Sequence, residues 1–98
     1  MIHLPGHTPG SAALHVAGYD ALLVGDAIAT YGVTTGTHGP QIAPFTADRR
    51  QALASLDRLE RFEARLLLPG HGQAWTGGVA EAIRRVRAGA AAAALAKR

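Results

Sequence analysis

The stretch Ala21-Leu22-Leu23-Val24-Gly25-Asp26 predicts the central strand of the fold. It is a short apolar run that ends at a glycine and an acidic side chain. A continuous apolar run of this length is typical of a strand that is buried on both faces. Upstream of it, Ser11 to Val16 alternates between two sides, and Gly18-Tyr19-Asp20 supplies a turn. The two segments therefore predict a β-hairpin whose second strand ends at Asp26.

Two further strands are predicted, one upstream and one downstream of this hairpin. Ile2 to Leu4 is a short extended segment that leads into the irregular loop Pro5-Gly6-His7-Thr8-Pro9-Gly10, where neither a helix nor a regular ladder fits. The run Leu66-Leu67-Leu68 is too short for a helix and stops at Pro69-Gly70. It therefore predicts another buried strand, and His71 follows its end.

Two amphipathic helices are predicted from apolar side chains that recur every three or four residues. The first helix begins behind Thr46, which is the expected N-cap, and the second begins at Val79. The apolar positions are Leu53, Leu56, Leu59 and Phe62 in the first helix and Val79, Ile83, Val86 and Ala90 in the second. Residues 27–45 are rich in glycine and threonine and show no periodicity, so they predict a long loop.

The 98 residues are enough for one domain, and no internal repeat or linker divides them. Hydrophobic residues make up 48% of the chain but aromatic residues only 5%, so we expect a shallow core. A chain this short buries about two thirds of its unfolded surface, so a partner or a metal ion is expected to add stability. The absence of cysteine excludes disulfides, thiolate metal sites and a cysteine nucleophile.

A net charge of +3 permits nucleic-acid binding but does not require it. Basic residues cluster at the end of the chain, at Arg84, Arg85, Arg87, Lys97 and Arg98. Because no aromatic platform accompanies them, they are better explained as a solvated helix face, with Glu81 and Arg85 spaced as an i,i+4 pair. The longest nearly apolar run, residues 88–96, is too short to span a membrane, and no secretory signal is visible. We therefore expect a cytoplasmic protein.

His7, Asp26 and His71 share a placement, since each follows an extended apolar segment and lies beside a glycine. The carboxyl ends of sheet strands collect ligands and active sites, so we expect the three side chains to meet. Two imidazoles and one carboxylate suit zinc, manganese or iron(II) and leave coordination positions open for water or substrate. Taken singly, each residue is better explained as a turn former or a satisfied loop residue. Together they indicate metal-assisted hydrolysis.

The sequence lacks the motifs of two other kinds of site, a serine-hydrolase active site and a nucleotide-binding loop. Ser11 follows a glycine, but no Gly-x-Ser-x-Gly elbow surrounds it, which excludes a serine hydrolase. The loop from Gly6 to Gly10 lacks the Lys-Ser/Thr pair and the following helix of a nucleotide-binding loop. His3 and His15 are expected to be structural, whereas His38 in the long loop is a candidate for a substrate contact.

Three segments in this order resemble the metallo-β-lactamase superfamily: Pro5-Gly6-His7-Thr8-Pro9-Gly10-Ser11, Leu23-Val24-Gly25-Asp26 and Leu68-Pro69-Gly70-His71-Gly72. The helix that contains Ser55-Leu56 and the strand after it also look like the family's, so the resemblance extends from residue 1 to about residue 85. It implies that His7 is a ligand of a first metal ion, that Asp26 bridges two metal ions and that His71 is a ligand of the second.

The family's His-x-His-x-Asp-His motif, which supplies the other metal-facing side chains, has no counterpart here. The resemblance therefore implies an α/β (α+β) fold in which residues 1–98 form a single partial domain. This domain would be the C-terminal half of an αββα sandwich, with a small mixed β-sheet and two helices. Such a half exposes an apolar sheet face, which we expect a second copy in a homodimer, or a separate N-terminal half, to cover. The third alternative is a truncated gene product that folds poorly, in which nothing covers the face.

Two functions remain open. In the first, the chain is a fragment of a metallo-β-lactamase-fold hydrolase, in which bound zinc, or iron or manganese, activates water against an ester, thioester or lactam-like bond of a small molecule. Asp26 is then the expected catalytic residue. In the second, the chain is a non-catalytic half-domain, a homodimeric or partner-completing interaction module, and the metal is absent. A metal content of about one ion per chain distinguishes the two.

Overall fold

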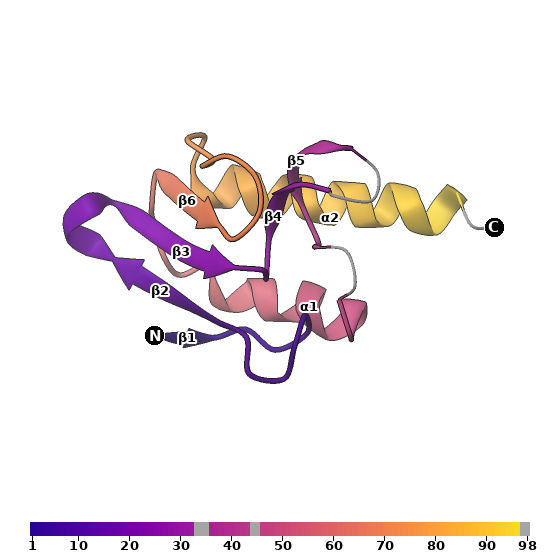
Figure 1. The fold of residues 1–98 in the computed structure, drawn as a ribbon, viewed down its shortest axis with the longest axis horizontal. Coiled ribbons are helices and arrows are strands. Elements are labelled where there is room, and N and C mark those ends of the chain that lie inside the picture. Colours follow the sequence, from indigo (N-terminus) through magenta and orange to yellow (C-terminus); the bar gives the residue numbers. More distant parts are fainter. Residues whose placement is uncertain (33–35, 44–45, 97–98) are drawn as a thin grey trace.

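Residues 1–32, 36–43 and 46–96 are described by the computed structural model and form a mixed α/β fold (Figure 1). The strands are β1 (Ile2–His3), β2 (Ala12–Val16), β3 (Ala21–Gly25), β4 (Ala29–Tyr31), β5 (His38–Gln41) and β6 (Leu66–Pro69). The helices are α1 (Arg49–Ser55) and α2 (Val79–Ala96), with short 3-10 turns η1 (Ala17–Tyr19) and η2 (Leu56–Arg58). The predicted small mixed sheet with two helices is confirmed.

The main sheet has the strand order β1-β2-β3-β6 in the described part of the chain. β2 and β3 form the predicted antiparallel hairpin, with Leu14 opposite Leu23. β6 runs parallel to β3 along its other side, with Leu67 beside Leu22. Because β3 and β6 run in the same direction, their carboxyl ends lie at the same edge of the sheet.

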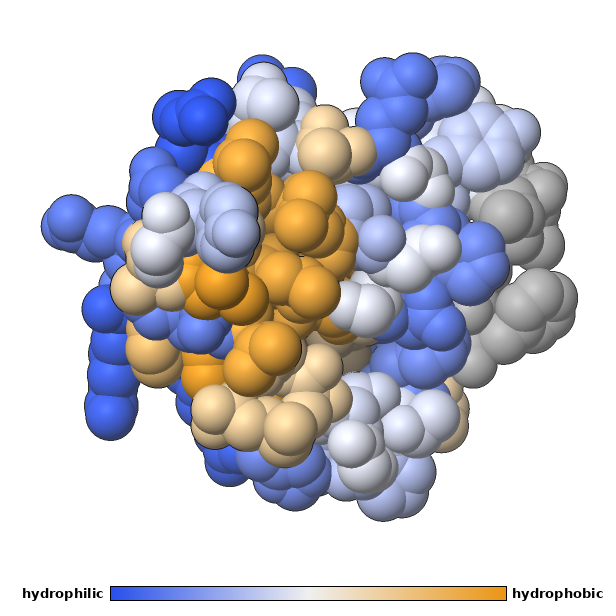
Figure 2. Space-filling view, turned by 60° about the vertical axis from the view of Figure 1, so that its left-hand side comes forward, coloured by the Kyte–Doolittle hydropathy of each residue, from blue (hydrophilic) through white to orange (hydrophobic). Residues whose placement is uncertain are grey.

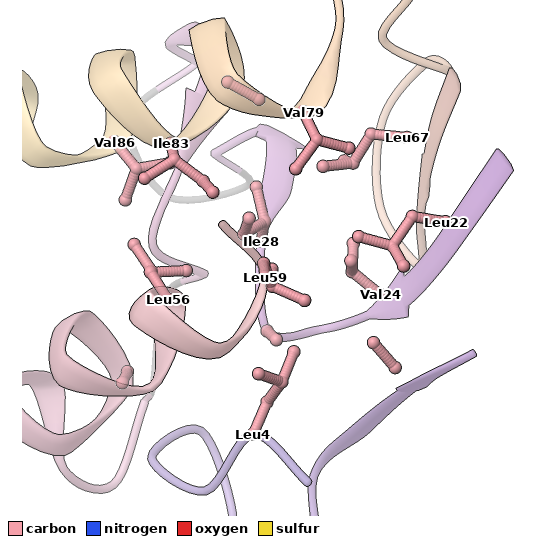
Figure 3. Packing of buried hydrophobic residues seen from close by; sticks show 14 of the residues in the cluster. Leu4, Leu22, Val24, Ile28, Leu56, Leu59, Leu67, Val79, Ile83 and Val86 are labelled. Atoms are coloured by element: carbon pink, nitrogen blue, oxygen red, sulfur yellow. The ribbon is translucent and has the colours of Figure 1, made fainter. Parts of the chain in front are cut away.

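The core lies between one face of this sheet and the helical segments (Figure 3). Leu22, Val24 and Leu67 enter it from the sheet, and each is at most 1% exposed. The helical side contributes Leu56, Leu59, Val79, Ile83 and Val86, which are also almost fully buried. Full burial of one such side chain contributes about 1.5–3 kcal/mol, so the predicted apolar spacing is what holds the helices against the sheet.

The opposite face of the sheet is covered by no element of residues 1–32, 36–43 and 46–96. The prediction that residues 21–24 are buried on both faces is therefore wrong at Leu23, which is 38% exposed, as is its neighbour Leu14 at 45%. The β-pairing places further apolar residues on the same side, and Figure 2 shows an apolar patch over this part of the molecule. We call this patch the open sheet face; it consists of Leu14, Val16, Leu23, Leu66 and Leu68.

The segment between β3 and α1 is not the long loop that the sequence predicted. β4 and β5 pair as an antiparallel two-stranded sheet, β5 packs against α2, and Ile28 and Ala29 are fully buried. Strands of three and four residues are too short to show an alternating pattern, which is why the sequence does not reveal them. Residues 33–35 and 44–45 of the predicted loop lie outside the described residues.

The start of α1 also differs from the prediction. The N-cap is Asp48, whose side chain accepts a hydrogen bond from the backbone N–H of Gln51 at 2.9 Å, and Thr46 is not the cap. Thr and Asp are both good N-cap residues, so sequence preference does not choose between two candidates that lie so close together. The predicted helix is also shorter, because the chain tightens after Ser55 into the 3-10 turn η2.

α2 begins at Val79 as predicted, and its last turns extend beyond the rest of the fold (Figure 1). Glu81 accepts hydrogen bonds from Arg84 and Arg85, which confirms the predicted i,i+4 pair. These bonds, the one from Arg84 first, lower the pKa of Glu81 to about 2, and the ionised carboxylate complements the macrodipole in the first turn.

No helix in the described part of the chain is long and apolar enough to cross a membrane. The cytoplasmic location stays a prediction. Lys97 and Arg98, the last two residues of the basic cluster, lie outside the described residues.

Candidate metal centre

The three candidate ligands meet at the edge of the sheet where β3 and β6 end. Asp26 lies between the two histidines: its Oδ1 is 2.8 Å from Nδ1 of His71, and its Oδ2 is 3.8 Å from Nε2 of His7. The side chains of His7, Asp26 and His71 are 20%, 39% and 54% exposed, respectively. The expectation that they meet is therefore confirmed, and the cluster opens to solvent on the His71 side.

Asp26 is positioned by the paired ends of β3 and β6. The N–H of Gly70 donates to the carbonyl of Gly25 at 2.8 Å. Gly25 has a φ of +54°, a left-handed conformation that glycine adopts at little cost and that ends the strand just before Asp26. A Cβ at position 70 would lie 2.6 Å from Oδ1 of Asp26, so glycine at this position leaves the space that the carboxylate occupies.

The loop that carries His7 is fixed by α1. The hydroxyl of Ser55, which is buried, donates to the carbonyl of Pro5 at 2.7 Å. Gly6 has a φ of +145° and lies so close to the helix that an added Cβ would be 2.3 Å from Cα of Ala52. The family-like Ser55-Leu56 segment therefore has a physical role, because it holds the loop of the first candidate ligand.

His71 is held by the β4 strand that the sequence did not reveal. The N–H of Thr30 donates to the carbonyl of His71 at 3.1 Å, and the hydroxyl of Thr30 donates to the carbonyl of Gln73 at 2.6 Å. A Cβ on Gly72, whose φ is +94°, would lie 2.2 Å from Oγ1 of Thr30. The small two-stranded sheet thus supports the third candidate ligand.

The other histidines make contacts that involve none of the three candidate ligands. Nε2 of His3 donates to a backbone carbonyl in the loop before β2 at 2.7 Å, and the ring of His15 lies edge-on to Phe62 with the centroids 5.0 Å apart. Both contacts agree with structural roles. The ring of His38 lies 5.0 Å from that of Tyr31, and its role in substrate contact stays a prediction.

The donor set suits a metal ion, although the cluster is not a preformed cage. Among the described residues, no three His, Asp or Glu side chains surround a ready metal position; instead, Asp26 accepts a direct hydrogen bond from His71. The 3.8 Å between Nε2 of His7 and Oδ2 of Asp26 is shorter than a Zn–N and a Zn–O bond together, about 4.1 Å. One ion can therefore contact both atoms, and the ligand roles of the three residues stay predictions.

The fold is thus a mixed sheet with helices on one face, and His7, Asp26 and His71 meet where β3 and β6 end. The sequence profile of the metallo-beta-lactamase superfamily matches residues 1–71, and the chain belongs to this superfamily. A metallo-beta-lactamase family protein from Thermus thermophilus has a similar crystal structure, with 27% sequence identity and a TM-score of 0.64.

That similarity covers 92% of this chain but only 29% of the Thermus protein. The chain therefore corresponds to a fragment of the metallo-β-lactamase fold, as the resemblance implied. None of the curated proteins matches it in sequence.

Proposed function

We propose that the chain is the C-terminal half of a metallo-β-lactamase-fold hydrolase, in which His7, Asp26 and His71 bind a metal ion, with zinc as the first candidate. The observation that carries this proposal is the carboxylate of Asp26, which presents one oxygen to each histidine. Membership of the superfamily supports metal-dependent hydrolysis as the reaction class. When bound, the metal supplies Lewis-acid activation of water at neutral pH.

In this proposal the three candidate ligands have different roles. Asp26 contributes the negative charge and orients His71 through their hydrogen bond. His71 lies at the exposed side of the cluster, where an ester, thioester or lactam-like bond of a small molecule can approach. His7 is the least exposed of the three and provides the fixed imidazole of the site.

The first test is the metal content of the chain, purified without chelators or immobilised metals and measured by plasma mass spectrometry with a native mass on the same sample. We expect about one zinc, manganese or iron ion per chain, because two imidazoles and a carboxylate make an open three-ligand site. Removal with a chelator and return of zinc serve as the control for reversible binding. A folded chain that stays metal-free in excess zinc would contradict the proposal.

We also propose that a second β-sheet, from the rest of a metallo-β-lactamase domain, covers the open sheet face in the working protein. Two observations support this occupant. The exposed leucines Leu14 and Leu23 lie opposite each other on adjacent strands, and a continuous apolar sheet face in water favours a partner. The solved Thermus relative is much longer than the region that matches, which is 29% of its chain.

Sedimentation and binding of an apolar fluorescent dye test whether the open sheet face is exposed in the isolated chain or covered by a second copy. We expect the isolated chain to sediment as a monomer that binds the dye, and a Leu14→Lys/Leu23→Lys variant to lose most of this binding without a change in its circular dichroism. Leu95→Lys, at a leucine on α2 that is 64% exposed, is the matched control and should retain the signal.

A different result would favour the second function. A stable dimer that excludes the dye, and that the double lysine variant converts to monomers, would assign the face to a second copy. Combined with an absence of bound metal, that outcome would make the chain a non-catalytic homodimeric module.

A further inference from the structure

Thr46 makes two hydrogen bonds through a single hydroxyl. Its Oγ1 lies 2.7 Å from the carbonyl oxygen of Ala43 and 3.2 Å from Nδ1 of His7. A carbonyl oxygen can only accept, so the one proton of the hydroxyl goes to Ala43. The hydroxyl oxygen is therefore left as an acceptor, and Nδ1 of His7 is the donor.

This direction determines the tautomer of His7. A neutral imidazole carries its proton on one nitrogen only. With the proton on Nδ1, Nε2 presents a bare lone pair, and the group opposite it is Oδ2 of Asp26 at 3.8 Å. Two lone-pair-bearing atoms thus face each other at more than hydrogen-bond distance, an arrangement that a cation between them stabilises.

We propose that Thr46 is the positioning residue of this site, which holds His7 as the Nδ1–H tautomer with Nε2 free to bind a metal ion. The part of the proposal that concerns the metal rests on the proposed function, whereas the tautomer does not. The backbone around Thr46 supports the same role. The N–H groups of Ala47 and Asp48 donate to the carbonyls of His7 and Gly6 at 3.2 and 2.8 Å.

The segment from Thr46 to Asp48 therefore fixes His7 through both its backbone and its ring. Because Asp48 caps α1, the hydroxyl of Thr46 is available for the ring. A hydrogen bond of this kind, from the second nitrogen of a metal-binding histidine, orients the ring and makes it a better ligand.

The experiment compares Thr46→Val, which keeps the branched shape but loses the hydroxyl, with Thr46→Ser, which keeps the hydroxyl. Thr76→Val, at an exposed threonine before α2, is the control for the same chemical change elsewhere. The first readout is which ring nitrogen of His7 carries the proton in the metal-free protein. It is obtained from long-range nitrogen–proton NMR correlations of the neutral ring. The second readout is zinc affinity by competition with a chelator, and thermal unfolding verifies that each variant is folded.

We expect the unsubstituted chain, Thr46→Ser and Thr76→Val to carry the proton on Nδ1. Thr46→Val should populate the other tautomer and bind zinc about 10–100-fold more weakly. A proton on Nε2 in the unsubstituted chain, or a folded Thr46→Val protein with an unchanged tautomer and affinity, would overturn the inference. A chain with the Nδ1–H tautomer that binds no zinc contradicts the proposed function instead, so the two failures are distinguishable.

Discussion

Gly6→Ala is expected to lower the midpoint of thermal unfolding by about 12 °C or more, which corresponds to about 3 kcal/mol for a domain of this size. Two effects add. The φ of +145° at Gly6 is a conformation that a side chain strains by about 1–3 kcal/mol. The new Cβ would also lie 2.3 Å from Cα of Ala52 and 2.4 Å from its nitrogen, and backbone atoms cannot move aside as a flexible side chain can, so overpacking costs about 1–3 kcal/mol more.

The measurement is thermal unfolding followed by far-ultraviolet circular dichroism. Gly10→Ala is the matched control, since the same loop offers open space at that position and its φ lies outside the left-handed region. We expect the control to unfold within a few degrees of the unsubstituted chain. If Gly6→Ala unfolds at the same temperature as Gly10→Ala, the close packing of the His7 loop against α1 is wrong.

Asp26→Asn is expected to reduce the metal content to a small fraction of that of the unsubstituted chain and to weaken zinc binding at least about 100-fold. Loss of an outer partner of a ligand already costs about 10–100-fold, and Asp26 is the shared group between both histidines. Asparagine keeps the shape but removes the negative charge. It also turns one of the two oxygens that face the histidines into an amide NH2, which cannot bind a metal ion.

Asp20→Asn is the control for this change of charge. Asp20 has a φ of +52° in the turn before β3, a left-handed conformation that asparagine tolerates as well as aspartate does. Metal content and affinity, measured as for the unsubstituted chain, should therefore be unchanged in this control. An Asp26→Asn protein that retains a full metal complement would show that Asp26 is not a ligand.

Some elements of this fold follow from local patterns alone. The β2–β3 hairpin, β6 and α2 all lie where the sequence predicts them, because an apolar run between turn residues and a regular helical spacing are properties of a few consecutive residues. The three candidate ligands are predictable for the same reason, since each lies beside a glycine: Asp26 and His71 come just after β3 and β6, and His7 lies in the loop that follows β1.

Other elements needed information from distant parts of the chain. β4 and β5 are too short to show a period, and they exist because they pair with each other and because β5 packs on α2. Thr46 and Asp48 have similar capping preferences, and only the tertiary contact of Thr46 with His7 separates their roles. The alternating pattern of β2 likewise does not show which of its two sides is buried. In the structure Ala13 is buried, and the larger Leu14 lies on the exposed side.

The family, the principal strands, α2 and the identity of the candidate ligands follow from the amino-acid sequence alone, because a motif and a period are read from neighbouring residues. Tertiary packing specifies the rest: His7, Asp26 and His71 meet, Thr46 fixes the tautomer of His7, and one face of the sheet is open. The site depends on contacts between residues 39 and 45 positions apart, and the open face depends on which side of the sheet the helices cover. No local pattern specifies how such distant segments pack.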